Sequence, residues 1–494
     1  MNRACGILLH PTSLPSPFGI GDLGDAAFAW ITMLKASGQS FWQFLPLGPS
    51  GQYGSPYHCA CSFAGNPLLV SPQKLGERGL LTKSELAAYP ALPQDRVDYP
   101  AVAREKEKLF RIAFGRFQEQ DELLAFCEEE QSWLDKYTLF CALKKEFGDQ
   151  SWTSWNGPLR LCEQGALDSY GKQHGRELLY HAFVQYVFYE QWAAVRDHAQ
   201  SEGVLLIGDV PIYVALESSD AWSCPDLFEF DANRNPVRVA GVPSDYYSET
   251  GQLWGNPVYN WDALGKDGFS WWIARTKKML QFADLLRLDH FRAFESFWAV
   301  KAGSPTAQDG AWVKGPGMRL FEALRLEIGS LPFIAEDLGV ITQEVEALRD
   351  EAGLPGMKVL QFAFDNNPDN PHRPYNYPFD SVVYTGTHDN DTTAGWLNTL
   401  SGPDRARVDE YIGSCKPAAV DDLVRLAFST TADLCIVPLQ DVLGLDSRAR
   451  MNTPGRSEGN WQWRCAKADF TRQKLARVAE FAAIYGRNGP DKQG

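Results

Sequence analysis

The run DLLRLDHF at residues 284–291 decides the fold more clearly than any other stretch, because it is short and apolar and carries an acidic residue, Asp289, near its end. Seven other short, β-rich apolar runs accompany it, and most are continuous apolar stretches, as expected for strands buried on both faces of a parallel sheet. They are CGILLH (5–10), SFWQFLPLG (40–48), VLLIGDVPI (204–212), PFIAEDLG (332–339), MKVLQFAF (357–364), VVYTGTHDN (382–390) and LCIVPLQDVLG (434–444).

Helical patterns separate these runs. In DLGDAAFAWITMLKASG (22–38) the apolar residues fall on one face, and we expect Asp22 to cap the helix and Gly38 to end it. In ITQEVEALRDEAG (341–353) Thr342 and Gly353 are the corresponding signals. Eight strands alternating with helices predict an α/β protein, and the count of eight favours a closed (β/α)8 TIM barrel over an open doubly wound sheet.

The spacing of the strands predicts one catalytic barrel domain over residues 1–494 with two large insertions. Residues 49–200, between the second and third strands, are rich in Glu, Lys and Arg and should be largely helical. Residues 213–280, between the third and fourth strands, group Trp, Tyr, Gly and Pro and should form lobes over the mouth of the barrel. We expect no all-β module, such as a C-terminal β-sandwich, after the eighth strand.

Composition excludes several classes of protein. With 44% hydrophobic and 22% charged residues in 494, the chain has the balance of a globular protein. Its formal net charge of -15 would repel phosphate backbones and anionic lipids, so we expect neither nucleic acid nor membrane partners. Residues 1–12 are too broken for a signal peptide and no run reaches the roughly 18 apolar residues of a membrane helix, so a cytoplasmic location is expected. The 16 Trp and 18 Tyr offer flat faces that suit sugar rings.

Acidic residues lie where most of the predicted strands end. They are Asp209, Asp289, Glu336, Asp337, Asp389 and Asp441. Because catalytic side chains of such barrels lie at the carboxyl ends of the strands, these acids should face one cleft. Acids gathered in a partly desolvated pocket raise the pKa of at least one of them, so that one stays protonated while its neighbours are ionised. Each could also be a helix cap or ion-pair partner, but together they favour glycoside cleavage.

A retaining glycosidase or transglycosylase needs a nucleophilic carboxylate about 5 to 5.5 Å from a protonated carboxyl. Asp289 in RLDHFR has arginines on both sides, which would favour its ionised form as nucleophile. Glu336 on the next strand would act as acid and then as base, and Asp389 would bind the 2- and 3-hydroxyls of the sugar. His290 and His388 adjoin these acids and are expected to bind sugar hydroxyls, although core positions are the alternative. The acids lack the H-x-x-x-H or His-rich spacing of a catalytic metal site, so we expect no metal and no cofactor.

At these residues the chain resembles the amylomaltases, the 4-α-glucanotransferases of glycoside hydrolase family 77. The resemblance covers nearly the whole chain and rests on these strings: GILLHPTSLPSPFGIGDLG, LPLGPSGQYGSPYHCACSFAGNPLL, IGDVPIYVALESSDAW, GVPSDYYSETGQLWGNPVYNW, RLDHFRAF, IAEDLG, YTGTHDNDTTAGW and MNTPGRSEGNWQWR. It implies a retaining transfer between α-1,4-glucan donors and acceptors, with Asp289 as nucleophile, Glu336 as acid/base and Asp389 as transition-state stabiliser.

The same resemblance implies further binding residues. Arg287 would position the nucleophile, Tyr57 would stack under the donor sugar, and Asp209 would be a structural carboxylate beneath the site. The acceptor side would be covered by the loop with Tyr246, Tyr247 and Gly251 and by Trp254, while Asn452 and Pro454 would lie near the cleft. Cys59 and Cys61, where the chain reads CSFAGNP, have no assigned role.

The acids alone do not decide between transfer and hydrolysis. An aromatic, largely apolar cover over residues 245–253 would exclude water and hold a second glucan, which favours transfer. An α-amylase-like hydrolase is the nearest alternative, and a non-catalytic glucan-binding barrel is a second. An unrelated aldolase or isomerase barrel is disfavoured because we identify neither a Schiff-base lysine in a strand nor a glycine-rich phosphate loop after the seventh and eighth strands. We expect a monomer or weak homodimer.

Overall fold

The computed structural model describes residues 3–51, 54–244, 249–413, 417–456 and 458–488. Eight parallel strands close into a barrel in the order β1-β12-β11-β10-β9-β6-β3-β2. They are β1 (Ala4–Leu8), β2 (Phe41–Gln43), β3 (Leu205–Pro211), β6 (Leu285–Asp289), β9 (Phe333–Ala335), β10 (Gly356–Val359), β11 (Ser381–Tyr384) and β12 (Leu434–Pro438). Each overlaps one of the eight predicted runs, with β1, β10 and β11 beginning one residue before theirs, so the predicted (β/α)8 barrel is confirmed.

The barrel strands carry apolar residues on both of their faces. One cluster of buried apolar side chains includes Leu8, Ile207, Ile334, Val359, Val382 and Ile436, each from a different barrel strand. Neighbouring residues such as Ile7, Leu206 and Val383 belong to a second, larger cluster that also contains helical side chains. Because successive strand side chains point to opposite faces, this division places the first cluster inside the barrel and the second between barrel and helices.

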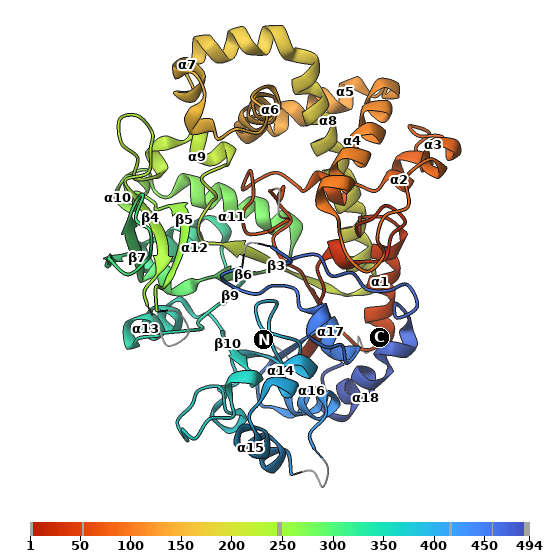
Figure 1. Ribbon diagram of the computed structural model, residues 1–494, viewed down its shortest axis with the longest axis vertical. Coiled ribbons are helices and arrows are strands. Elements are labelled where there is room, and N and C mark those ends of the chain that lie inside the picture. The colour runs from red at the N-terminus through yellow and green to blue at the C-terminus, as the bar shows by residue number, and fades with distance from the viewer. Residues whose placement is uncertain (1–2, 52–53, 245–248, 414–416, 457, 489–494) are drawn as a thin grey trace.

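A layer of helices connects β2 to β3 and appears in orange and yellow at the top of Figure 1. Its helices are α2 (Pro72–Glu77), α3 (Lys83–Ala87), α4 (Tyr99–Arg116), α5 (Gln120–Glu129), α6 (Gln131–Glu146), α7 (Gly157–Arg160) and α8 (Gln164–Glu202). A buried ion pair of 2.6 Å between Lys278 Nζ and Glu130 Oε1 ties this layer to the helix that precedes β6.

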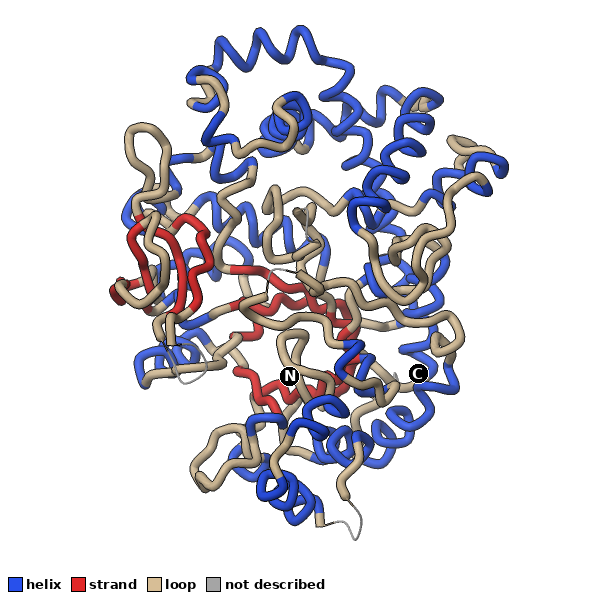
Figure 2. Tube along the Cα trace, viewed as in Figure 1, coloured by secondary structure: helices blue, strands red, loops and turns tan. Residues whose placement is uncertain are grey.

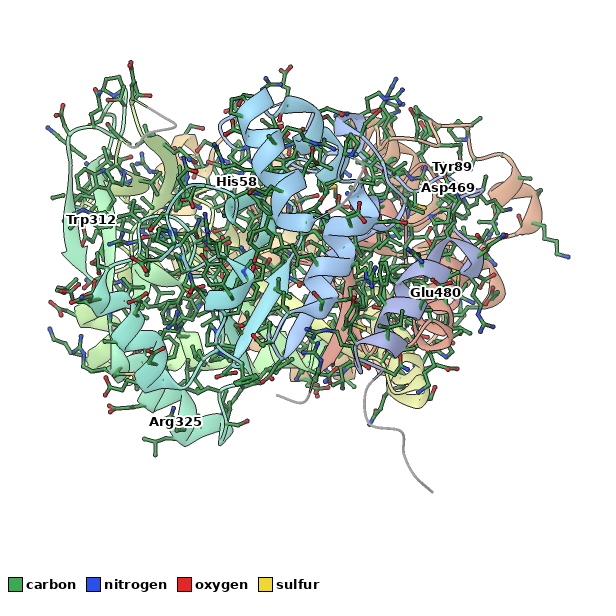
Figure 3. All side chains as sticks on the ribbon, turned by 90° about the horizontal axis from the view of Figure 1, so that it is seen from below. His58, Tyr89, Trp312, Arg325, Asp469 and Glu480 are labelled. Atoms are coloured by element: carbon green, nitrogen blue, oxygen red, sulfur yellow. The ribbon has the colours of Figure 1, made fainter. Side chains whose placement is uncertain are left out.

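A separate four-stranded antiparallel sheet, in the order β5-β4-β7-β8, stands beside the barrel and is the second group of strands in Figure 2. Its strands are β4 (Arg238–Val242), β5 (Gln252–Pro257), β7 (Ser296–Lys301) and β8 (Gly310–Lys314). In the view of Figure 3, Trp312 of β8 lies at one edge of the molecule, and Tyr89, Asp469 and Glu480 lie toward the other. Sequence analysis did not predict this sheet, half of which follows β6 and so lies outside the insertion assigned to residues 213–280.

The remaining helices surround the barrel or extend its loops. They are α1 (Asp25–Ala36), α9 (Ser219–Ser223), α10 (Trp261–Lys266), α11 (Ser270–Phe282), α12 (Met318–Ile328), α13 (Gln343–Ala352), α14 (Thr393–Thr399), α15 (Gly402–Ile412), α16 (Val420–Ser429), α17 (Leu439–Val442) and α18 (Ala476–Ile484). Short 3₁₀ turns lie at Pro11–Ser13, Pro67–Leu69, Trp152–Ser154, Pro225–Leu227, Phe291–Phe294, Leu360–Phe362, Pro374–Asn376, Ser447–Ala449 and Arg472–Leu475. After β12 the described residues form helices, turns and loops, and within the described chain no helix is long and apolar enough to cross a membrane.

One predicted helix signal is wrong. Helix α1 begins at Asp25 with Gly24 as its N-cap, and Asp22 does not cap it. The Asp22 carboxylate instead accepts hydrogen bonds from Gly24 N at 3.0 Å and Ser16 Oγ at 2.9 Å, which closes the turn before the helix. The end of the helix was predicted more closely, because α1 stops at Ala36 and Gly38 follows with a φ of 69°.

Candidate active site

The predicted acids lie at the carboxyl ends of neighbouring barrel strands. Asp289 is the last residue of β6, and Glu336 directly follows β9. Parallel pairing of Leu288 with Ala335 puts the next residue of each strand, Asp289 and Glu336, at the same level of the barrel. Asp389 lies in the loop that follows β11. The three acids therefore rise from the same end of the barrel, as parallel strands require.

Arg287 links the nucleophile candidate to a deeper carboxylate. Its Nη1 lies 2.8 Å from Asp289 Oδ1 and 2.7 Å from Asp209 Oδ2. Asp209 is 3% exposed and also accepts a hydrogen bond of 2.9 Å from the Tyr57 hydroxyl. Burial raises the pKa of Asp209 above its ordinary value, and the guanidinium opposes this effect. The buried cation thus holds Asp289 and Asp209 in fixed positions, and Asp209 in turn orients Tyr57.

The surroundings of Glu336 differ from those of Asp289 in burial and in hydrogen bonding. It is buried, and its carboxyl oxygens accept main-chain hydrogen bonds from His290 N at 2.6 Å and Leu338 N at 3.0 Å. Burial raises the pKa of Glu336 well above its ordinary value, and the charge of Asp289 adds to the increase. The Arg287 charge and the two N–H groups oppose it without reversing it. This carboxyl group therefore keeps its proton to a higher pH than an ordinary glutamate does, and it stands beside an ion-paired carboxylate.

Asp389 is the most open of the three acids, with a side chain 42% exposed, compared with 26% for Asp289. Its Oδ1 accepts a hydrogen bond of 2.6 Å from Asn452 Nδ2, and its Oδ2 lies 3.3 Å from His388 Nε2. Asn452 N also donates to His388 O at 3.0 Å. The segment around Asn452, which is distant in sequence, thus completes the surroundings of Asp389.

Two aromatic groups flank the acids. The rings of Tyr57 and His388 stack with centroids 5.2 Å apart and an angle of 16° between planes, and Trp461 contacts both at 5.7 and 5.9 Å. Trp254 meets His290 edge to face at 4.8 Å. His290 and Trp461 have positive φ values of 53° and 65°, which are uncommon for residues of this size and are concentrated at functional sites.

The two histidines act as neutral groups. Burial lowers the pKa of His290 to about 3, and it lowers the pKa of His388 although the Asp389 charge opposes the shift. Neutral imidazoles at neutral pH can donate and accept hydrogen bonds, which fits binding to sugar hydroxyls better than charge stabilisation does. Among the described residues, no group of three or more His, Cys, Asp or Glu side chains could hold a metal ion.

The structure brings most of the predicted site residues together, but not all. Arg287, Asp209, Tyr57, His388 and Asn452 form one contact network with the acids, as described above. Trp254 joins it through His290. Gly251 closes a turn in which an added Cβ would lie 2.3 Å from Val242 O, at a φ of 66°. Pro454 is exposed, and Tyr246 and Tyr247 lie outside the described residues.

Sequence reasoning missed two contributors to this network. Trp461 stands in the quoted NWQWR string but was given no role. Arg450 donates from Nη2 to Asp389 O at 2.7 Å and from Nε to Asn452 O at 2.6 Å. Neither residue lies at a strand end, so the rule that located the acids could not locate them. Asp337, in contrast, was predicted to face the cleft but pairs with Arg349 at 2.5 Å and accepts from Met357 N at 2.6 Å.

A closed (β/α)8 barrel with a carboxyl group of raised pKa beside an ion-paired carboxylate indicates the class of this protein, an enzyme that acts on glycosidic bonds. Comparisons with known proteins narrow that class. Residues 9–469 match the sequence profile of glycoside hydrolase family 77, 4-alpha-glucanotransferase. The chain belongs to this family, and it is a 4-alpha-glucanotransferase of the amylomaltase type that acts on α-1,4-glucans.

Individual relatives match nearly the whole of this chain in sequence or in structure. The 4-alpha-glucanotransferases of Thermus thermophilus and Synechocystis sp. are each 46% identical over 98% of this chain, and the match covers 99% and 98% of those proteins. Among solved structures, the amylomaltase of Streptococcus agalactiae in complex with acarbose is 35% identical with a TM-score of 0.96, covering 98% of this chain and 99% of that one. The amylomaltase of Corynebacterium glutamicum, at 18% identity and a TM-score of 0.80, covers 97% of this chain and 75% of its own and shares the fold.

Proposed function

We propose that this chain transfers α-1,4-glucan segments by a retaining double displacement through a covalent glycosyl-aspartate at Asp289. One observation carries the proposal: Asp289 and Glu336 stand at the same level on adjacent strands, and their environments oppose each other. Asp289 is ion-paired with Arg287 at 2.8 Å, whereas burial raises the pKa of Glu336. An ion-paired carboxylate beside a carboxyl group that holds its proton more tightly can supply a nucleophile and an acid.

In the first step an Asp289 oxygen attacks the anomeric carbon of the donor while Glu336 gives its proton to the leaving 4-oxygen. The bond between C1 and that oxygen breaks, the new chain end departs, and the glycosyl ester remains. In the second step the Glu336 carboxylate takes the proton of an acceptor 4-hydroxyl, whose oxygen attacks C1 and frees Asp289. Glu336 regains its proton, so the cycle closes, and two inversions give net retention.

The surrounding residues would bind the sugar at the cleavage point. Asp389, which is exposed enough to meet substrate, would accept hydrogen bonds from the 2- and 3-hydroxyls as the ring flattens. His388 and His290 would add neutral hydrogen bonds, and Tyr57 would offer its ring to the apolar face of the donor sugar. The contact of Trp254 with His290 supports a place for Trp254 beside the acceptor sugar, next to the cleavage point.

Transfer requires that a glucan hydroxyl attacks the intermediate before water does. We assign this selection to residues 245–253, which include Tyr247 and extend into the first two residues of β5. An α-amylase-like hydrolase with the same acids is the alternative. Incubation of the pure protein with maltotriose separates the two, because transfer yields glucose together with maltopentaose and longer chains, whereas hydrolysis yields only maltose and glucose.

Two variants complete the test. Asp289→Asn should be folded and inactive, since the amide cannot form the ester. Tyr247→Ala should shift the products of maltotriose from longer chains toward hydrolysis. An unchanged ratio of transfer to hydrolysis in this second variant would count against the role of the loop, while the first variant tests the chemistry alone.

A further inference from the structure

The loop between β11 and α14 is held at both ends by one buried carboxylate. Asp441, which is 2% exposed, accepts hydrogen bonds of 2.6 Å from the Thr385 hydroxyl and from both the main-chain N and the hydroxyl of Thr393. Asp389 lies between these anchors, and its side chain is 42% exposed. Burial therefore does less to fix this acid than it does for Glu336. Within the loop Asp389 N donates to Thr387 Oγ1 at 3.2 Å, and the hydrogen bonds that Asp389 accepts come from outside the loop.

Those contacts come from the segment that follows β12. Arg450 Nη2 donates to the main-chain oxygen of Asp389 at 2.7 Å, and Arg450 Nε donates to that of Asn452 at 2.6 Å. Asn452 closes the link by donating from Nδ2 to Asp389 Oδ1 at 2.6 Å and from N to His388 O at 3.0 Å. One guanidinium thus bridges the backbone of the acid and the backbone of the residue that holds its carboxylate.

The chemistry of arginine suits this bridge. The planar guanidinium presents its N–H donors in a fixed geometry. Two carbonyl oxygens that accept from the same guanidinium are therefore held at a fixed distance from each other. Within the part of the chain that the structure describes, this guanidinium makes no ion pair with a carboxylate. Arg450 also lines a pocket together with His388 and Asn390, which places it directly against the loop.

We propose that Arg450 is a positioning residue that sets the place of Asp389 for transition-state stabilisation. This inference rests on the role given to Asp389 under the proposed function. Because Asp389 binds the sugar more strongly as its ring flattens, an Asp389 displaced from its place should lower kcat more than it raises KM. Arg450→Ala should therefore lower kcat on maltotriose on the order of 10- to 100-fold with KM changed much less.

Matched variants separate this role from a general structural one. Arg448→Ala is the control, since Arg448 lies two residues away with a side chain 92% exposed and pairs with Asp446, so its kcat should equal that of the wild type. Arg450→Lys keeps the charge and at most one of the two contacts, and its kcat should fall between those of the wild type and Arg450→Ala. Thermal unfolding of each variant shows that the protein assayed is folded.

The deciding experiment is a double-mutant cycle with Asp389→Asn. If Arg450 acts through Asp389, adding Arg450→Ala to Asp389→Asn should change kcat by no more than about twofold. A further 10-fold loss or more in that background, or a wild-type kcat in Arg450→Ala alone, would overturn the inference. If Arg450→Ala does not fold, Arg450→Lys takes its place in the cycle. A wild-type kcat in Asp389→Asn alone would instead overturn the role of Asp389 in the proposed function.

Discussion

Replacement of Glu336 by glutamine tests the division of labour between the two central carboxyl groups. A glutamine cannot give a proton to the leaving oxygen, and general acid catalysis contributes typically 10²- to 10⁴-fold to a rate. The initial rate of maltotriose disproportionation should fall by about that factor, which corresponds to about 3–5 kcal/mol of transition-state stabilisation. The loss should appear in kcat, because the acid acts only in the transition state.

The same change has a calculable structural cost. Glu336 accepts one main-chain N–H on each oxygen, from His290 and from Leu338. The amide keeps only one oxygen, so one of these N–H groups loses its acceptor, at a cost of about 1–3 kcal/mol in the free energy of unfolding. Burial favours the neutral form of Glu336, so replacing the carboxyl group with a neutral amide adds no further burial cost.

Asp337→Asn is the matched control, because the neighbouring carboxylate is equally buried but pairs with Arg349 and Met357 N away from the cleft. It should lower stability by a similar amount and leave kcat per folded molecule unchanged. A maltosyl fluoride donor sharpens the assay, since fluoride departs without a proton and the first fluoride release of Glu336→Gln should be as fast as in the wild type. If fluoride release is slowed as much as maltotriose cleavage, or if Asp337→Asn loses as much kcat, Glu336 is not the acid.

Three further predictions follow from other contacts. Tyr57→Phe removes one of the two hydrogen bonds to the buried carboxylate of Asp209 but keeps the stacked ring, so it should lower the free energy of unfolding by about 1.5–3 kcal/mol with a small rise in KM. Tyr57→Ala should also raise KM severalfold. Equal KM values in the two variants would contradict stacking of the ring on the sugar. Because the pKa of Glu336 is raised, the proton needed for the first step is still present above the ordinary glutamate pKa of about 4.3 and is lost only as pH rises through the raised pKa. The alkaline limb of kcat/KM should therefore lie well above that ordinary value, and a limb at the ordinary value would contradict the assignment. Lys278→Met leaves Glu130 without its buried cation and should lower the free energy of unfolding by about 3–5 kcal/mol in denaturant titrations, with kcat of the folded enzyme unchanged.

The barrel could be predicted because its strands give a strong local signal. A strand covered on both faces is a continuous apolar run, and all eight runs became barrel strands. The four-stranded sheet gives no such signal. Strand β8 is mostly exposed, and β7 pairs with β4 although the barrel strand β6 lies between them in the sequence. Pairing between distant segments depends on tertiary packing that a local pattern does not contain.

The same distinction explains what was found at the site. Asp289, Glu336 and Asp389 could be located because acids at strand ends must converge at one end of a barrel. Arg450 could not, because its contact with Asp389 joins residues 61 positions apart through a loop that has no periodic pattern. Asp22 was misassigned because a carboxylate before a helix can either cap it or close the preceding turn, and its spacing to Gly24 serves the turn.

The covalent intermediate is the most direct test of the mechanism. Glu336→Gln incubated with maltosyl fluoride should form the ester, since fluoride needs no acid, and should release it slowly, since no base activates the acceptor. Mass spectrometry of the quenched protein should then show an added maltosyl group, and peptide mapping should place it on Asp289. A maltosyl group on any other residue, or products of inverted anomeric configuration with no adduct, would contradict a double displacement at this aspartate.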